Sequence, residues 1–284
     1  MGKDLSDKSL DTDSSEKQLD KPLSNKYVLN IKTVQAGAFR ILIEALKEIL
    51  TDSNLIIDDT GIKLVATDNS SNVLIHLKLD AENFEEYYCP EKVSIGMNMN
   101  NLFKLIKTMN NNDTLTLFME NDDKNRLGIQ ITNDEKNTQT IFKMNLLDIE
   151  ANEINIPPAT FETELTMPSG DFQKIIRDMT NIGDKVEIQS SGHNLLLKCR
   201  GDYAHQETIL SETENENGLQ YKEIEENTLI QGMFSLKYLV LFTKCTNLCN
   251  LINLYIKNDY PLIIKYTVAN LGSIRLCLAP IIED

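Results

Sequence analysis

The alternation of hydrophobic and polar positions changes its period several times along the chain. Residues 27–34, "YVLNIKTV", alternate with a period of two, which predicts a strand. The next segment, 36–50, repeats its apolar residues every three or four positions and predicts a helix. Its apolar stripe consists of Phe39, Leu42, Ile43, Leu46 and Leu50. Further alternating segments follow, separated by turn signals such as Thr60-Gly61, so strands are expected to dominate the fold.

The order of predicted elements occurs twice. Three further helices are predicted, at residues 99–108, 169–183 and 234–245. Phe39 and Phe172 open equivalent helices, and "LFMEND" from Leu117 matches "LYIKND" from Leu254 at nearly the same offset. Two matches in the same order and at nearly equal spacing indicate an internal duplication. We therefore predict an α+β fold made of two similar domains.

The segment between the two halves, "LLDIEANEINIPPATFET", is typical of a linker. Pro157 and Pro158 cannot lie in a central strand, and the segment carries acidic residues without a basic one. The first residues are rich in Ser, Asp and Lys and lack aromatic residues, which predicts a disordered tail. The predicted divisions are a tail at 1–26, an N-terminal domain at 27–145, a linker at 146–163 and a C-terminal domain at 164–284.

The composition is strongly acidic, with 28 Lys+Arg against 43 Asp+Glu in 284 residues and a formal net charge of −15. This balance argues against a protein that simply coats nucleic acid, but it allows a basic surface inside an acidic shell. No apolar run approaches the ~18 residues of a membrane span, so we expect no membrane partner. The first residues fit a myristoylation pattern at Gly2, although a plain flexible tail is favoured because no polybasic stretch follows. Five scattered cysteines favour free thiols in a reducing compartment.

Every predicted helix carries a basic pair whose spacing puts both side chains on one face. The eight residues are Arg40, Lys47, Lys104, Lys107, Lys174, Arg177, Lys237 and Lys244. For a single helix, the ordinary explanation is that lysines solvate an exposed face. Four helices with the same arrangement in an acidic chain favour one shared basic surface. Such a surface fits sequence-independent, salt-sensitive contact with DNA phosphates and offers no element that reads bases.

The motifs of catalysis are missing from the sequence. It has no Gly-x-x-x-x-Gly-Lys-Ser/Thr motif for a nucleotide, and no nucleophile pattern accompanies its three histidines. We therefore expect no enzyme activity, no catalytic residues and no cofactor. Cys245 and Cys249 lie four residues apart and could supply two metal ligands, but further ligands are lacking nearby. Free thiols are the favoured interpretation of this pair, so no metal site is predicted.

Four long segments of the sequence closely resemble proliferating cell nuclear antigen, the eukaryotic and archaeal DNA sliding clamp. They are "KVSIGMNMNNLFKLIK" (92–107), "MPSGDFQKIIRDMTNIGD" (167–184), "LKYLVLFTKCT" (236–246) and "LAPIIED" (278–284). The resemblance extends from about Tyr27 to Asp284. It implies two domains of sliding-clamp topology in each of three identical subunits, with helices lining a central channel and curved sheets outside. The Asn- and Ile-rich composition fits an AT-rich genome such as that of a large DNA virus.

The resemblance also implies roles and partners. The eight basic residues match channel positions that contact double-stranded DNA, although Ile41 stands where the family is usually basic and Asn181 where it often has His. The subunits of the homotrimer would join through edge strands that resemble 138–142 and 205–211. Expected partners are DNA polymerase, an ATP-driven clamp loader and other proteins with clamp-binding peptide motifs. The expected location is the nucleus, or a cytoplasmic replication factory if the protein is viral.

Family clamps hold a partner motif, Gln followed by an aliphatic and two aromatic residues, in a groove beside the linker. The matching residues here are Leu74, Ile154, Ile156, Pro261, Ala279 and Pro280. Thr67 replaces a family Met and Cys277 replaces a frequent Tyr, so the partner preference is expected to differ. Without the resemblance, Ile154 and Ile156 would be interpreted as core residues. The alternative function is a subunit of a heterotrimeric checkpoint clamp, or a clamp-like scaffold that does not encircle DNA.

Overall fold

The structure is a computed structural model that describes residues 26–150, 154, 159–215, 217–224 and 229–282. The predicted tail lies outside the described residues except for Lys26, and so does the myristoylation pattern at Gly2. Most of the central part of the predicted linker, including Ile156, also lies outside them, whereas Ile154 is described.

The described residues of the first half form two α-helices and nine strands, with one short 3-10 helix. In chain order they are β1 (Tyr27–Thr33), α2 (Ala36–Ile49), β2 (Asp52–Asp58), β3 (Gly61–Thr67), β4 (Val73–Asp80), η1 (Ala81–Asn83), β5 (Glu86–Tyr88), β6 (Val93–Asn98), α3 (Met99–Ile106), β7 (Thr114–Glu120), β8 (Asp123–Asn133) and β9 (Thr138–Asn145). The strands alternate buried and exposed side chains, as a sheet with one covered face requires.

The second half repeats this series. Its elements are β10 (Thr163–Pro168), α4 (Ser169–Thr180), β11 (Lys185–Ser191), β12 (Asn194–Arg200), β13 (His205–Ser211), β14 (Gln220–Glu223), β15 (Ile230–Ser235), α5 (Leu236–Phe242), η2 (Thr243–Leu248), β16 (Leu251–Ile256), β17 (Leu262–Val268) and β18 (Gly272–Leu278). The strand order β5-β1-β7-β8-β9 of the first half has its counterpart in β14-β10-β16-β17-β18, and β4-β3-β2-β6 has its counterpart in β13-β12-β11-β15. The predicted α+β fold of two similar domains is confirmed.

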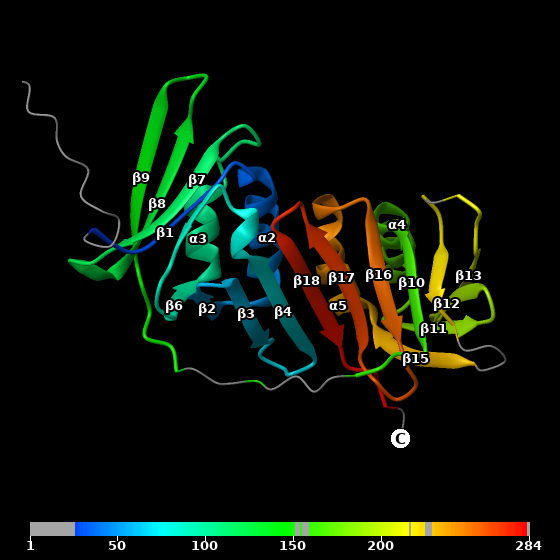
Figure 1. Ribbon diagram of the computed structural model, residues 1–284. Coiled ribbons are helices and arrows are strands. Elements are labelled where there is room, and N and C mark those ends of the chain that lie inside the picture. Colours follow the sequence, from blue (N-terminus) through cyan, green and yellow to red (C-terminus); the bar gives the residue numbers. More distant parts are fainter. Residues whose placement is uncertain (1–25, 151–153, 155–158, 216, 225–228, 283–284) are drawn as a thin grey trace, which may run out of the picture.

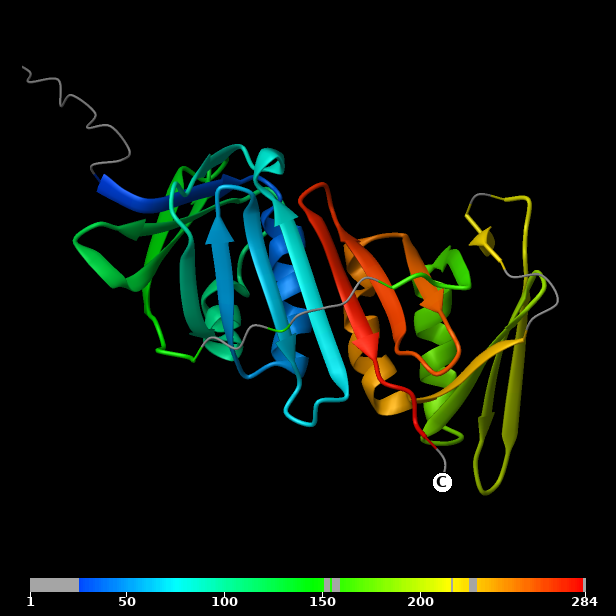
Figure 2. The ribbon, with the colours of Figure 1, turned by 60° about the horizontal axis from the view of Figure 1, so that its bottom comes forward.

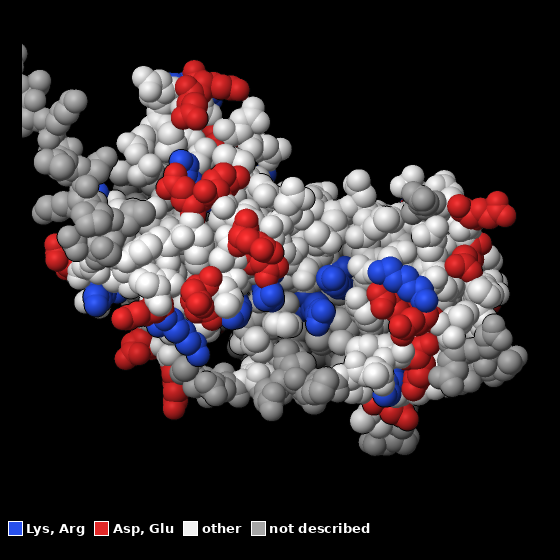
Figure 3. All heavy atoms as spheres, in the orientation of Figure 1, with Lys and Arg blue, Asp and Glu red and all other residues white. Residues whose placement is uncertain are grey.

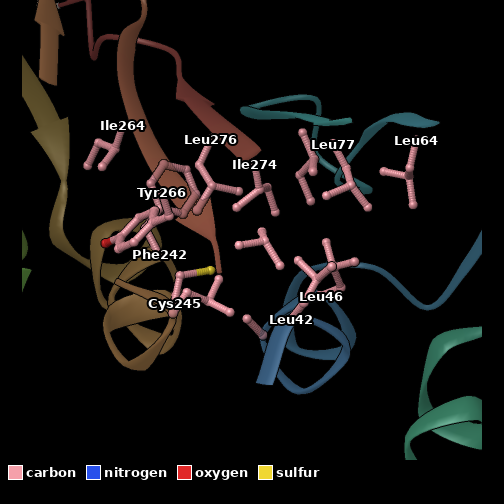
Figure 4. Packing of buried hydrophobic residues seen from close by; sticks show 14 of the residues in the cluster. Leu42, Leu46, Leu64, Leu77, Phe242, Cys245, Ile264, Tyr266, Ile274 and Leu276 are labelled. Atoms are coloured by element: carbon pink, nitrogen blue, oxygen red, sulfur yellow. The ribbon is translucent and has the colours of Figure 1, made fainter. Parts of the chain in front are cut away.

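The two halves are joined by the pairing of β18 with β4, which we call the intrachain junction. These antiparallel strands align from Gly272 opposite Leu79 to Leu278 opposite Val73, and they merge nine strands into one sheet (Figure 1). The apolar core continues beneath the junction. In Figure 4, side chains of α2 and β4 from the first half face those of β17, β18 and α5 from the second. The two halves therefore share one buried interface, and the linker is not their sole connection.

The four α-helices of the described residues lie together on one face of this sheet (Figure 2). α2 packs against α3 and against α5, and α5 packs against α4, so the helices form a continuous row across both halves. Each is amphipathic: Leu42 and Leu46 of α2, for example, are fully buried against the sheet. No helix in the part of the chain that the structure describes is both long enough and apolar enough to cross a bilayer.

All four predicted helices end before their predicted last residue, and the fourth departs most from the sequence pattern. Residues 234–245 were expected to be helical, but Phe234 and Ser235 complete β15 and the α-helix ends at Phe242. From Thr243 the chain continues as the 3-10 helix η2, and the Thr243 hydroxyl donates a hydrogen bond of 2.8 Å to the carbonyl oxygen of Val240. Such a side-chain bond competes with the regular helical pattern. Lys237 and Lys244 consequently do not lie on one continuous α-helix.

Candidate functional site

The face of the helical row that points away from the sheet, here called the helix face, carries most of the predicted basic residues. Six of the eight are exposed, and none of these six forms an ion pair with a carboxylate of the described residues. They are Lys104, Lys107, Lys174, Arg177, Lys237 and Lys244. Because the six are contributed by α3, α4, α5 and η2, both halves of the chain supply free positive charge to the helix face.

Helix α3 illustrates how the sequence determines that these basic side chains are exposed on the helix face. It begins after Asn98, whose side-chain oxygen accepts a hydrogen bond of 3.0 Å from the backbone N–H of Asn101. Leu102 and Ile106 are buried, which fixes the rotation of the helix on the core. Lys104 and the C-terminal cap Lys107 are therefore left exposed on the opposite side.

The two basic residues of α2 differ from the other six. Arg40 is half-buried with its Nη1 atom 3.8 Å from Oε2 of Glu44, and Lys47 forms an ion pair with Glu48. The ammonium of Lys47 also lies 4.9 Å from the ring centroid of Phe103 on α3. Both side chains are confined because α2 packs between α3 and α5. The spacing of Arg40 and Lys47 along the sequence predicted that they share a face. It did not predict that glutamates partly neutralise their charges.

The predicted edge segments lie on strands with one unpaired side. Among the described residues, β9 pairs only with β8 and β13 pairs only with β12. Figure 1 shows β9 and β13 on opposite sides of the molecule. Each edge exposes a large apolar side chain, with Ile141 51% exposed on β9 and Ile209 59% exposed on β13. Free, partly apolar edges are ready to pair with another strand.

The other face of the nine-stranded sheet carries the predicted groove residues. Leu74 of β4 lies directly opposite Cys277 of β18, which lies opposite Ile263 of β17, and Ile263 lies opposite Tyr255 of β16. We call these four half-buried residues the apolar row. Thr67 extends the row on β3 as the partner of Leu74, so both departures from the family pattern fall on this line.

Three further predicted groove residues, Pro261, Ala279 and Pro280, adjoin strands β17 and β18, which carry the middle of the apolar row. Pro261 immediately precedes β17, and the backbone N–H of Ala279 donates a 2.9 Å hydrogen bond to the carbonyl oxygen of Asn72. Pro280 lines a cavity of about 770 Å³ together with Tyr260. Ile154 is half-buried, and Ile156 lies outside the described residues. The structure thus brings the described groove residues of β4, β18 and the C-terminal segment to one region of the sheet.

Sequence comparison with the family pattern missed several residues of this region. A cavity of about 340 Å³ is lined by Phe161, Tyr255, Ile263 and Arg275 among others. The ring centroids of Phe161 and Tyr255 are 5.4 Å apart, which indicates a small aromatic cluster. The alternation of "LIIKYTV" placed Ile263 on the same face as Lys265, a signal that would have identified it.

Two residues farther along each strand lies a second line of side chains, which we call the basic row. His76 of β4 lies opposite Arg275 of β18, and Arg275 lies opposite Lys265 of β17. Figure 3 shows Lys and Arg side chains gathered over these central strands, on a face that is otherwise dotted with acidic groups. Burial lowers the pKa of His76, and the charges of Arg275 and Lys78 lower it further.

The thiols are chemically quiet. Burial raises the pKa of Cys277 to about 11, although nearby Arg275 opposes the rise, so the thiol is protonated at neutral pH. Burial also raises the pKa values of Cys245 and Cys249. Within the described ranges, no three His, Cys, Asp or Glu side chains lie together in a way that could hold a metal ion.

Comparisons with known proteins follow the same division of the chain. The family model described as "Proliferating cell nuclear antigen, N-terminal domain" matches residues 28–154, and the corresponding C-terminal model matches residues 155–281. The chain is 36% identical over 263 residues to the "Probable DNA polymerase sliding clamp 1" of Paramecium bursaria Chlorella virus 1, covering 91% of this chain and 99% of that protein. The crystal structure of Proliferating Cellular Nuclear Antigen from Entamoeba histolytica matches with a TM-score of 0.82 and 26% identity, over 90% of this chain and 100% of that one.

Proposed function

Because the chain belongs to the proliferating cell nuclear antigen family, we propose that it forms a homotrimeric ring that encircles duplex DNA and keeps a DNA polymerase on its template. In this role the protein is a sliding clamp that acts as a processivity factor without catalysing a reaction itself. The observation that carries the proposal is the relation between the intrachain junction and the two free edges.

The internal repeat supports a particular contact between subunits. β9 occupies in the first half the place that β18 occupies in the second, and β13 occupies the place of β4. Because β18 pairs with β4 inside the chain, the same pairing between copies would join β9 of one subunit to β13 of the next. This contact is head-to-tail, and head-to-tail contacts close into rings when the rotation allows it. Three subunits would alternate three intrachain junctions with three equivalent contacts between chains.

The intrachain junction also provides a register for the contact between subunits. Ile274 lies opposite Leu77 in the junction, and the matching positions on the free edges are Thr140 of β9 and Thr208 of β13. Thr140 alternates with Ile141 and faces the same side as the buried Met144, which is the helix side of the sheet. We therefore place Thr140 at the middle of the inner side of this contact.

The helix face would line the channel of such a ring. Its exposed lysines and arginines reach phosphates without a helix or strand that enters a groove to read bases, so the grip would be independent of sequence. Loose contacts of this kind permit sliding, while the closed ring prevents dissociation. Arg40 and Lys47 would contribute less than the other six residues because they are half-buried and paired with glutamates.

The outer face of the sheet would recruit partners. The apolar row and the adjoining residues Pro261, Ala279 and Pro280 form the groove in which we place the motif of a polymerase or another replication or repair protein. A clamp loader would open the ring, at a replication site in the nucleus or in a cytoplasmic factory. In the heterotrimeric alternative, the edges β9 and β13 would pair with other subunits, so the purified chain alone would not form a trimer.

A topological experiment tests the proposal without a loader. The protein is incubated with linear duplex DNA whose ends are free, the ends are then blocked with streptavidin, and the DNA is washed in high salt. High salt removes phosphate contacts but leaves a threaded ring in place. We expect retention that is lost when a restriction enzyme cuts the blocked DNA. Complete release by salt alone, with the ends still blocked, would contradict encirclement.

A further inference from the structure

The outer face of the nine-stranded sheet carries positive charge beside an apolar groove, and we propose that this groove selects partner segments whose binding motif is flanked by acidic residues. The inference deepens the proposed function, since it rests on a partner motif occupying the apolar row. It concerns the chemistry of the partner and assigns a specificity role to Lys265 and Arg275.

The basic row is built into the sheet alongside the apolar row. On β18 the two rows are represented by Cys277 and Arg275, and on β17 by Ile263 and Lys265. Residues two apart on a strand face the same side and are separated by about 7 Å. A peptide that lies over Cys277 and Ile263 therefore has its neighbouring residues within reach of the two cations. The cavity of about 340 Å³ links the rows because both Ile263 and Arg275 line it. Glu164 and Glu223 line it as well, and Glu164 is paired with Lys222 at 3.2 Å.

The two cations of the basic row form no ion pair with a carboxylate of the described residues. Elsewhere on this face, Lys63 lies 2.8 Å from a carboxylate oxygen of Asp58, and Lys78 lies 2.6 Å from one of Asp80. Among the described residues, neither Lys265 nor Arg275 has such an ion pair.

The two cations also face each other across the strands. Lys265 and Arg275 lie directly opposite each other on β17 and β18. Like charges in this arrangement are destabilising. A carboxylate placed between them would relieve that repulsion, so the pair is arranged to receive an anion. The lowered pKa of His76, caused by burial and then by the cations Arg275 and Lys78, is consistent with this field.

The surroundings favour an acidic peptide over nucleic acid. The basic row spans three strands and ends at uncharged residues on both sides, Val65 on β3 and Asn253 on β16. A duplex would need a longer positive track for its regularly spaced phosphates. The adjoining apolar row has nothing to offer a phosphate, whereas it accommodates the aliphatic and aromatic side chains of a peptide.

Two matched peptides test the inference with the full-length protein. Both carry the same Gln-aliphatic-aromatic-aromatic motif and a fluorescein label. One has Asp-Glu-Asp on each side of the motif, and the other has Asn-Gln-Asn. Fluorescence anisotropy at low salt should give a Kd roughly tenfold lower for the acidic peptide, and the ratio should shrink at high salt because exposed charges are screened. Equal Kd values would overturn the inference, while the assignment of the apolar row as the binding site of the motif would be unaffected.

Paired variants locate the effect. Lys265→Gln with Arg275→Gln should abolish the preference, so that the acidic and the neutral peptide bind this variant with equal Kd values. The control, Lys124→Gln with Arg126→Gln on β8, removes the same formal charge from a different sheet and should keep the preference. Persistence of the preference in the first variant would overturn the assignment to the basic row.

Two further outcomes separate this inference from its foundations. If neither peptide binds the wild-type protein, both the assignment of the groove and the inference fail. The experiment with end-blocked DNA still tests independently whether the protein encircles DNA. If a 20-base-pair duplex displaces the acidic peptide from wild-type protein but not the neutral peptide, nucleic acid occupies the basic row and the inference is overturned. Continued binding of the acidic peptide in excess duplex supports it.

Discussion

Replacing Lys104 and Lys107 together by glutamate will shorten the stretch of DNA that a polymerase copies in one binding event, by about tenfold or more. Both side chains are exposed on the helix face and have no carboxylate partner among the described residues, so they are available for phosphates. Glutamate reverses their charge in every subunit and repels the DNA backbone. Run length is measured by primer extension on a long primed template with a loader and an excess of trap DNA.

The control for this charge reversal is Lys124→Glu with Arg126→Glu, which changes the formal charge equally on β8. It should preserve run length, because the lost charge lies outside the helix face. The native mass of the Lys104→Glu, Lys107→Glu protein should equal that of the wild type, since neither residue lies on an edge strand. An unchanged run length in this double variant would show that α3 does not face the DNA.

Replacing Thr140 by aspartate should convert the proposed trimer into monomers at micromolar concentration. Thr140 is exposed in the single chain, so the monomer tolerates the change. In the register taken from the intrachain junction, it becomes buried opposite Thr208 of the next subunit. Burying an unpaired carboxylate costs at least about 3 kcal/mol, a roughly hundredfold weakening at each contact, and the short side chain cannot reach solvent. Sedimentation analysis measures the resulting mass.

The matched control is Thr140→Val, which keeps the branched shape of the side chain and replaces the hydroxyl by a methyl group. This variant should remain trimeric, because an apolar side chain is tolerated on the inner side of a strand contact. Circular dichroism should show that both variants fold like the wild type. A trimeric Thr140→Asp protein would mean that β9 does not form the contact, or that its register differs from that of the intrachain junction.

Much of the local structure could be predicted from the sequence. The period of apolar residues identified helix α2 to within one residue, and the buried Leu102 and Ile106 fixed the direction of α3 as their spacing indicates. The internal repeat likewise emerged from two short matches, because equivalent elements keep equivalent core residues such as Phe39 and Phe172. These features depend on neighbours within a few residues, which a linear pattern records.

Features that depend on contacts between distant parts of the chain could not be predicted from the sequence. The apolar and basic rows each run across strands from distant parts of the chain, and their alignment depends on the register of the intrachain junction. A pattern within one strand shows that Ile263 and Lys265 share a face, but not that Arg275 lies opposite Lys265. The partial burial of Arg40 depends on the packing of α2 between two other helices, and the early end of α5 depends on one hydrogen bond of Thr243.

The native mass of the purified wild-type protein tests the central claim most directly. One chain has a mass of 32.2 kDa, and the proposed homotrimer, joined by pairing of β9 with β13, should have three times that mass at micromolar concentration. Sedimentation equilibrium over a range of concentrations would show this species and its dissociation. A protein that stays at the mass of one chain throughout the micromolar range would contradict the homotrimeric ring.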